Sequence, residues 1–140
     1  MAERFSTAFT CHYIDKIADT EKFLAANGPS VQAIATSGHD GVPDNLLDNL
    51  SNLKIISNYG VGYDAINVDK AVSQNILVTH TPDVLNEEVA TTALMLLMAV
   101  SRELIVNDSY IRKGNWSKKG NTPLSRAVDG MSVGILGYGR

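Results

Sequence analysis

The chain has 140 residues, of which 44% are hydrophobic and 19% are charged, and its formal net charge is −3. This length and this hydrophobic fraction indicate a globular domain with its own core and exclude an intrinsically disordered chain. The acidic balance argues against a protein that binds nucleic acid or an anionic membrane surface. The longest apolar run, residues 93–100, is far too short to span a membrane.

Neither the N-terminal residues nor the cysteine content points to secretion. The opening segment, MAERFSTAFT, lacks the apolar stretch of a signal peptide, and the single cysteine, Cys11, cannot form an internal disulfide. We therefore expect a soluble cytoplasmic protein. Cys11 beside His12 also has the composition of a metal or nucleophile pair, but no second ligand cluster and no orienting acid accompanies it.

Short β-rich segments alternate with helical ones over the first 80 residues. The predicted strands are rich in β-branched or aromatic residues and comprise residues 7–14, 31–36, 54–57 and 76–79. The predicted helices have apolar residues at helical spacing or a capping residue, and comprise residues 19–27 (with Asp19 as the N-cap), 43–50 and 68–73. This order predicts an α/β fold in which helices cover a flavodoxin-like parallel sheet.

A long helix is predicted after Pro82. Asn86 is a candidate N-cap, Glu87 and Glu88 fall in the first turn, and no helix-breaking residue follows until about Arg112. The middle of this helix is apolar on all sides, so we expect it to be buried against another subunit or a second domain.

The last part of the chain is predicted to be a connection followed by one strand. Residues 113–130 are polar and loop-like, with Trp116 as their one large apolar anchor. Residues 132–136 form a continuous apolar segment typical of parallel sheets, and Gly137 and Gly139 follow it directly. A strand that runs into Gly-x-Gly is the opening of a dinucleotide-binding turn, although tight turns of other kinds contain the same two glycines.

The segment Gly60-Val61-Gly62 follows the predicted strand at residues 54–57, at the end where open parallel sheets bind their ligands. Consecutive N–H groups in such a glycine-containing turn can bind an anion such as a carboxylate, although a plain flexible turn has the same composition. His39 and His80 also lie near strand ends, where each is either an acid–base group or a structural side chain.

Several spaced motifs together resemble one family, the D-isomer-specific 2-hydroxyacid dehydrogenases, and within it the glyoxylate/hydroxypyruvate reductase branch. The resemblance lies in the segments SGHDGV, ISNYGVGYDAINVDKAVSQNILVTHTPDVLNEEVATTALMLLMAVSREL, GNW and PLSRAVDGMSVGILGYGR. It implies reduction of a small 2-oxo acid to the 2-hydroxy acid with NADH or NADPH. Thr91 and His80 depart from the family, in which an acidic residue and an asparagine are usual at these positions.

The resemblance also implies a role for particular residues. Gly60, Val61 and Gly62 match the loop that binds the substrate carboxylate, chiefly through the N–H groups of Val61 and Gly62. Ala93 matches a helix position that faces the cofactor, and Gly137, Gly139 and Arg140 match the start of the pyrophosphate-binding loop. The helix at residues 86–112 matches the segment that forms a homodimer.

By the same resemblance, residues 1–84 are part of a substrate-binding domain and residues 85–130 are the interface helix and connection. Residues 131–140 are then the first strand and the opening glycine loop of a truncated Rossmann domain. The family's catalytic arginine, glutamate and histidine match no residue here, so we expect an N-terminal fragment that is inactive alone. Three alternatives stay open: a corepressor-like binding protein on the same scaffold, a flavodoxin-like binding module, and a relative of phosphoglycerate or phosphite dehydrogenases.

Overall fold

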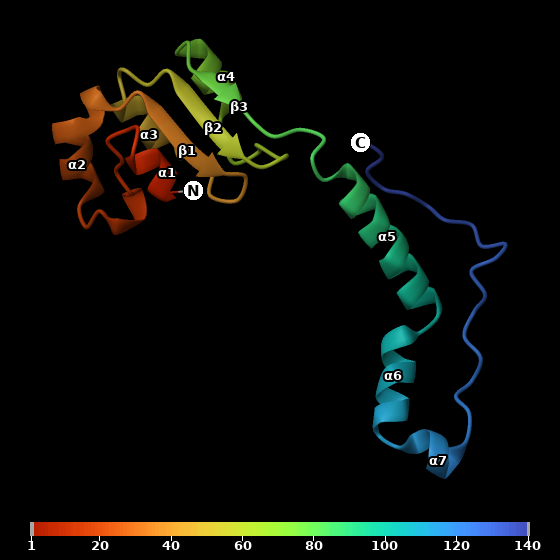
Figure 1. The fold of residues 1–140 in the computed structure, drawn as a ribbon. Helices are drawn as coiled ribbons and strands as arrows, with labels where there is room; N and C mark the ends of the chain where they lie inside the picture. The colour runs from red at the N-terminus through yellow and green to blue at the C-terminus, as the bar shows by residue number, and fades with distance from the viewer. Residues whose placement is uncertain (1, 140) are drawn as a thin grey trace. The chain divides into compact units, whose positions relative to one another are not determined.

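The computed structural model describes residues 2–139, and the chain divides into two compact units, Met1–Pro82 and Asp83–Arg140 (Figure 1). The first unit contains three parallel strands in the order β1-β2-β3, which are β1 (Ala33–Ser37), β2 (Ile55–Tyr59) and β3 (Leu77–Thr79). Its helices are α1 (Ala2–Ser6), α2 (Thr20–Asn27), α3 (Asp44–Asn49) and α4 (Val68–Ser73), with short 3₁₀ turns at Ile14–Lys16 and Gly28–Ser30. The predicted parallel α/β sheet is confirmed for these three strands.

The core of the first unit lies against one face of β2. Ile56 is fully buried and Asn58 is 2% exposed, whereas Tyr59 on the opposite face is 69% exposed. Alternate side chains of a strand point to opposite faces, so β2 has one covered and one open face. The covered face packs against aliphatic side chains from the helices and the segments around them: Leu24, Val42, Leu47, Leu50, Leu53, Ile66, Ala71 and Ile76.

Residues 7–14 do not form the predicted strand. The N–H groups of Ala8 and Phe9 both donate to the Phe5 carbonyl oxygen, so this segment continues the turn of α1. A strand is stable only when a neighbouring strand accepts its hydrogen bonds, and residues 7–14 pair with none of the described strands. The aromatic and β-branched composition of the segment was therefore misleading. The predicted N-cap is confirmed, because the Asp19 carboxylate accepts a hydrogen bond from the Lys22 N–H at 3.0 Å.

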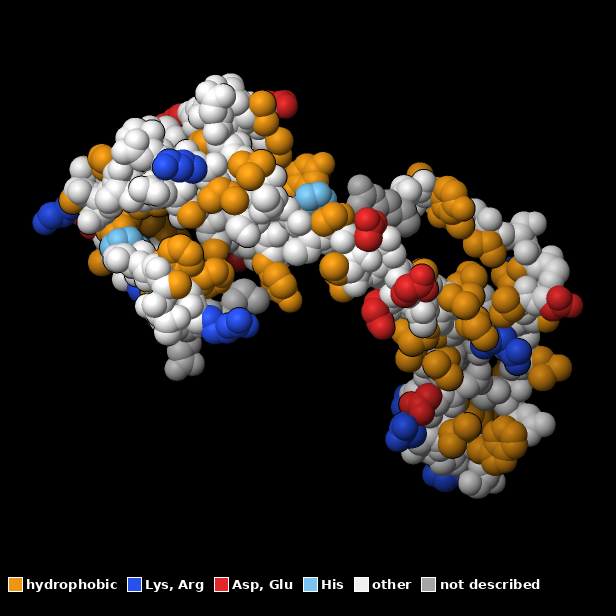
Figure 2. All heavy atoms as spheres, turned by 45° about the horizontal axis from the view of Figure 1, so that its top comes forward, with side chains coloured by type: hydrophobic (Ala, Val, Ile, Leu, Met, Phe, Trp, Pro, Cys, Tyr) orange, Lys and Arg blue, Asp and Glu red, His pale blue; other side chains and the backbone are white. Residues whose placement is uncertain are grey.

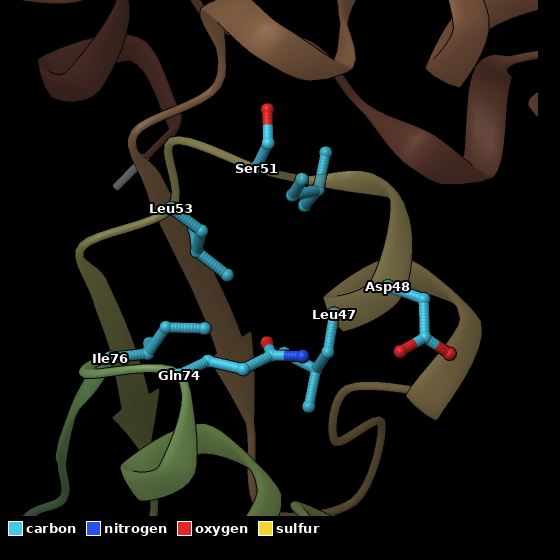
Figure 3. Close-up of a pocket in the computed structure, with 7 residues that line it drawn as sticks. Leu47, Asp48, Ser51, Leu53, Gln74 and Ile76 are labelled. Carbon is cyan, nitrogen blue, oxygen red and sulfur yellow. The ribbon is translucent and has the colours of Figure 1, made fainter.

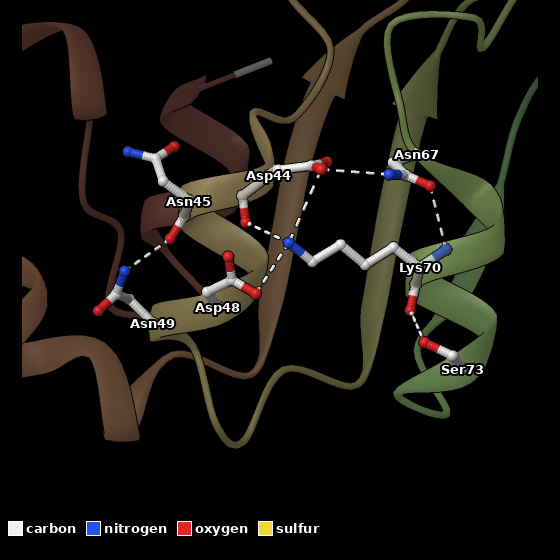
Figure 4. Close-up of polar contacts among 7 residues, drawn as sticks. All are labelled: Asp44, Asn45, Asp48, Asn49, Asn67, Lys70 and Ser73. Carbon is white, nitrogen blue, oxygen red and sulfur yellow. Dashed lines mark hydrogen bonds and ion pairs between the residues drawn. The ribbon is translucent and has the colours of Figure 1, made fainter.

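A group of ion pairs connects α3 to α4 at the surface (Figure 4). The Lys70 ammonium lies 2.8 Å from the Asp48 carboxylate and 3.7 Å from that of Asp44, and it also donates to the Asp44 carbonyl oxygen. The hydrogen bond to Asp48 raises the pKa of Lys70 above its ordinary value of 10.5. Because exposed ion pairs are screened by water, they contribute little to stability.

We expect Lys70→Met to lower stability slightly, and the deficit to depend on pH and salt. A raised pKa in the folded state means that the contribution of Lys70 is present below pH 10.5 and is lost as the pH rises above it. Urea unfolding followed by circular dichroism should therefore show a deficit at pH 8 that shrinks above pH 11 or in 1 M salt. Lys22→Met on α2 is the matched control. A deficit that persists in 1 M salt would show that lost packing, and not charge, causes it.

The second unit contains α5 (Asn86–Ser101), α6 (Leu104–Arg112) and α7 (Asn115–Lys119). None of the residues in these three helices is buried, and large hydrophobic side chains such as Leu94, Met95 and Val100 are about half to three-quarters exposed. Figure 2 shows such side chains gathered on the surface of this unit. The predicted apolar helix is thus present, and within the described chain no partner covers it.

The predicted continuous helix to Arg112 is interrupted. α5 and α6 are bent by 60° relative to each other, and Glu103 at the break has a left-handed φ of 50°. The Arg102 carbonyl oxygen accepts a hydrogen bond from the Asn107 side chain at 3.2 Å in place of a helical N–H. Asparagine side chains compete for backbone groups in this way, and this bond accompanies the break.

Two smaller predictions for this unit are also corrected. Leu85, and not Asn86, is the N-cap of α5, while the Asn86 side chain donates to the Asp83 carboxylate. The segment predicted as a loop contains α7, in which Trp116 is 53% exposed and is therefore not a buried anchor.

Residues 132–136 do not form the predicted strand either. The structure shows no helix or strand between residue 120 and residue 139, and Ile135 and Leu136 are 67% and 103% exposed. A parallel strand needs neighbours that complete its hydrogen bonds, and the described residues provide none for this segment.

Within residues 2–139, no single helix is long and apolar enough to cross a membrane. The bent pair α5 and α6 reaches that length and composition only when the two helices are taken together.

Candidate functional site

The loop Gly60-Val61-Gly62 lies where the strands of the parallel sheet end. It follows β2 directly, and the register aligns Ser37 at the end of β1 with Tyr59 at the end of β2. β3 ends at Thr79 beside them, so residues 38, 60–62 and 80–81 all follow the carboxyl ends of strands. Ligands of open parallel sheets bind at this edge.

All three carbonyl groups of this loop accept hydrogen bonds from the protein. The Gly60 oxygen accepts from the Thr81 N–H at 3.0 Å and from the Asn58 side chain at 3.3 Å. The Gly62 oxygen accepts from the same Asn58 amide at 2.8 Å. The Val61 oxygen lies 2.9 Å from Nδ1 of His80, and because a carbonyl only accepts, this ring nitrogen carries the hydrogen.

Two N–H groups of the loop, those of Val61 and Gly62, have no hydrogen-bond partner in the described chain. A peptide chain whose carbonyls are all held on the protein side presents adjacent N–H groups, and such groups bind anions. The loop can therefore bind a carboxylate without any charged side chain.

Gly38, at the end of β1, packs directly against this loop. A Cβ atom on Gly38 would lie 2.7 Å from the Gly62 carbonyl oxygen, and one on Gly60 would lie 3.1 Å from the Gly38 nitrogen. A Cβ on Gly62 itself would meet only the Asp64 carboxylate, at an ordinary 3.5 Å. Two of these glycines are thus required by close backbone packing, whereas Gly62 has room on the protein side.

In the described chain, His80 and His12 make packing or hydrogen-bond contacts and His39 is exposed. His80 binds the Val61 carbonyl, and its ring packs edge-on against Tyr63 with 5.0 Å between centroids, which is a structural role. His12 packs against the Phe23 ring, and His39 is exposed. Among the described residues, no group of three or more His, Cys, Asp or Glu side chains could hold a metal ion.

The predicted cofactor residues lie in the second unit. Ala93 is an exposed residue of α5, and Gly137 and Gly139 lie in the segment without regular structure. Gly137 has a φ of +84°, a conformation that glycine adopts freely. Arg140 lies outside the described residues. The structure thus brings Gly60, Val61 and Gly62 together as one loop, and it holds Ala93 and the two glycines in separate segments of the other unit.

A hollow of about 230 Å³ lies at the opposite end of the strands (Figure 3). Leu53 and Ile76, which precede β2 and β3, form part of its lining, together with Leu47, Asp48, Leu50, Ser51 and Gln74. The one carboxylate in this lining, Asp48, is already paired with Lys70. Ser51 and Gln74 are the other polar residues of this lining.

Sequence reasoning identified the loop but not the residues that hold it. Asn58 was passed over, although β-strand alternation places its side chain on the same face as Ile56 and so predicts a buried amide. The contact of Gly38 with the loop and the donation from Thr81 depend on which strands are neighbours. No local sequence signal carries that information.

The chain matches a family model and known proteins along most of its length. Residues 2–130 match the model for the catalytic domain of D-isomer specific 2-hydroxyacid dehydrogenases. The chain is 38% identical to a 2-ketogluconate reductase of Gluconobacter oxydans (strain 621H), with 99% of this chain and 43% of that protein covered. It is 41% identical to a glyoxylate/hydroxypyruvate reductase of Arabidopsis thaliana, with 84% and 37% covered.

A solved structure is similar over the same extent. An NADPH-dependent glyoxylate/hydroxypyruvate reductase from Sinorhizobium meliloti, in complex with NADP and malonate, aligns with a TM-score of 0.81 and 40% identity. The alignment covers 99% of this chain and 42% of that one. The chain therefore spans about two-fifths of the length of these relatives.

Proposed function

This chain belongs to the D-isomer specific 2-hydroxyacid dehydrogenase family, and from that premise we propose that it provides the substrate-carboxylate site of a 2-oxo acid reductase. The proposed substrate is a small acid of the glyoxylate or hydroxypyruvate type, and the proposed cofactor is NADH or NADPH. The observation that carries the proposal is the loop at residues 60–62, whose carbonyls are held by the protein and whose N–H groups at Val61 and Gly62 are unpaired.

The loop would bind the substrate through its carboxylate and so orient the neighbouring carbonyl group. Hydrogen bonds from backbone N–H groups to a charged carboxylate are stronger than those to neutral acceptors. Each such bond contributes about 1.5–3 kcal/mol. The N–H groups are fixed by the main chain, so they need no rearrangement when the substrate binds.

The glycine segment of the second unit leaves room for a dinucleotide. A Cβ atom on Gly137 or Gly139 would meet nothing within 4 Å, and the positive φ of Gly137 permits a tight turn, so a pyrophosphate could approach this backbone closely. We propose that Gly137, Gly139 and Arg140 contact the pyrophosphate and that Ala93 lines the cofactor site. When bound, the dinucleotide supplies the hydride that reduces the substrate carbonyl.

A hybrid enzyme tests this proposal. In the hybrid reductase, the matching 42% of the Sinorhizobium meliloti enzyme is replaced by the present chain. We expect it to oxidise NADPH when glyoxylate or hydroxypyruvate is added, whereas the 140-residue chain alone should show no turnover. Malonate should compete with the substrate. A folded hybrid that binds NADPH but neither reduces a 2-oxo acid nor binds malonate would exclude the proposed carboxylate site.

We further propose that α5 and α6 form a contact between two copies of the chain. Their large hydrophobic side chains are exposed, and contiguous exposed apolar surface often marks an interface; Leu96 and Val100 lie one helical turn apart, 53% and 77% exposed. Burial of such side chains against a second copy would remove this surface from water.

We expect light scattering to give twice the chain mass for the unchanged protein and the monomer mass for the double variant Leu96→Lys/Val100→Lys. Two charges at a buried apolar contact are too costly to desolvate. Val72→Lys on α4 is the matched control, because Val72 is 64% exposed in the other unit. A stable monomer of the unchanged chain at high concentration would contradict the proposed contact.

A further inference from the structure

Asn58 is a polar side chain inside an otherwise aliphatic core. It lies on β2 beside Ile56, on the covered face of the sheet, and only 2% of its surface is exposed. Among the described residues of the core it is the one polar side chain that is buried. An amide in such a position is costly unless hydrogen bonds replace its contacts with water.

The orientation of this amide is fixed by its surroundings. Nδ2 lies within hydrogen-bond distance of two carbonyl oxygens, at 2.8 Å from that of Gly62 and 3.3 Å from that of Gly60. Turning the amide over would place Oδ1 against both carbonyl oxygens, which are acceptors only. The nitrogen must therefore face the loop.

The other half of the amide is not satisfied. Oδ1 of Asn58 is buried and accepts no hydrogen bond from any residue that the structure describes. A buried acceptor without a partner destabilises the fold, whereas an apolar side chain of the same shape, such as leucine, would not. Stability of the core therefore does not explain an asparagine here, and the two bonds from Nδ2 to the loop are what the residue provides.

Those two bonds set the direction of the peptide groups in the loop. The carbonyls of Gly60 and Gly62 turn toward β2, and the N–H groups of Val61 and Gly62 are left unpaired. We propose that Asn58 is a positioning residue, which holds these two N–H groups in place to bind the carboxylate of the substrate. This inference rests on the proposed function for its ligand, but the effect of Asn58 on the loop can be measured without any substrate.

The first measurement uses the 140-residue chain without substrate. In amide NMR spectra, Asn58→Leu should shift or broaden the Val61 and Gly62 signals, while the amides of β3 stay protected. The matched control is Asn49→Leu, which removes an exposed asparagine that donates to the Asn45 carbonyl oxygen. Unchanged Val61 and Gly62 signals in folded Asn58→Leu would overturn the inference, whether or not the reductase proposal is correct.

The second measurement uses the hybrid reductase. Asn58→Leu should raise the KM for glyoxylate by about 10- to 100-fold, the loss expected for one or two weakened charge-assisted hydrogen bonds. The affinity for NADPH should stay the same and the variant should remain folded, although the Gly62 carbonyl oxygen loses the donor that Asn58 supplied. An unchanged KM in an active, folded variant contradicts the positioning role. Failure of the unmodified hybrid to bind malonate contradicts the reductase proposal instead.

Asn58→Asp gives a signature that a purely structural role would not produce. An ionised carboxylate at this position would repel the Gly60 and Gly62 carbonyl oxygens, whereas a protonated carboxyl group can donate to one of them. Burial also favours the protonated form. The KM of this variant should therefore fall toward the unmodified value as the pH is lowered, relative to the profile of the unmodified hybrid. A pH profile parallel to the unmodified one would count against the inference.

Discussion

Replacement of Gly62 by valine in the hybrid reductase should lower kcat/KM by about two to four orders of magnitude. The loss follows from two hydrogen bonds to the substrate carboxylate, each contributing about 1.5–3 kcal/mol. A β-branched residue restricts the backbone at the position that donates one of them and crowds the side from which the ligand enters. The fold itself should survive, because a Cβ on Gly62 meets only the Asp64 carboxylate at 3.5 Å.

Two comparisons show whether Gly62→Val impairs carboxylate binding specifically or the enzyme as a whole. Gly62→Ala places the same Cβ without branching, so its loss of kcat/KM should be smaller. The affinity for NADPH should change little in either variant, because the proposed pyrophosphate contacts lie at Gly137 and Gly139. If Gly62→Val keeps its affinity for glyoxylate, or loses NADPH binding equally, then the loop is not the carboxylate site.

Gly41→Ala should destabilise the first unit by about 2–6 kcal/mol, a large part of the stability of a small domain. Gly41 is buried and has a φ of +64°, a conformation that side chains rarely adopt. Its Cβ would also overlap the Ala65 carbonyl oxygen and the Ala65 side chain. Neither neighbour can move easily, because the Ala65 carbonyl accepts the N–H of Val42.

Hydrogen exchange at the amides of β2 measures this effect in the first unit alone. Protection of Ile56 should fall in Gly41→Ala and stay unchanged in Gly62→Ala, which adds the same methyl group where φ is not strained and space is available. Equal protection of Ile56 in the two variants would show that the contact between Gly41 and Ala65 relaxes without cost.

The sequence predictions were correct where the deciding interactions connect residues that are close in sequence. The Asp19 cap and the helix at Val68–Ser73 depend on neighbours within a turn, and the sequence predicted both. The segments at residues 7–14 and 132–136 have strand composition, but no described strand pairs with them. Composition alone does not form a strand, because a strand needs a hydrogen-bonded neighbour. The break at Glu103 is accompanied by a side-chain hydrogen bond of Asn107, and no hydrophobic pattern reveals either feature.

The candidate site divides in the same way. Gly60, Val61 and Gly62 were predicted because glycines after a parallel strand are a local signal. Asn58 is also local, and alternation with Ile56 would have revealed it. Gly38, His80 and Thr81 reach the loop from neighbouring strands 20 or so residues away in sequence, so only the register of the sheet brings them together.

The contacts that the loop offers to a carboxylate belong to the main chain, and this has a consequence for how such a protein can diversify. An N–H group is present whatever side chain the residue carries, so mutation of Val61 would change the shape of the site without removing its hydrogen-bond donor. Asn58, Gly38 and Gly60 would keep the donors in position meanwhile. Under the proposed function, main-chain groups recognise the acid group, whereas side chains recognise the rest of the substrate. New substrate preferences could then evolve one side chain at a time, with carboxylate binding intact at every step.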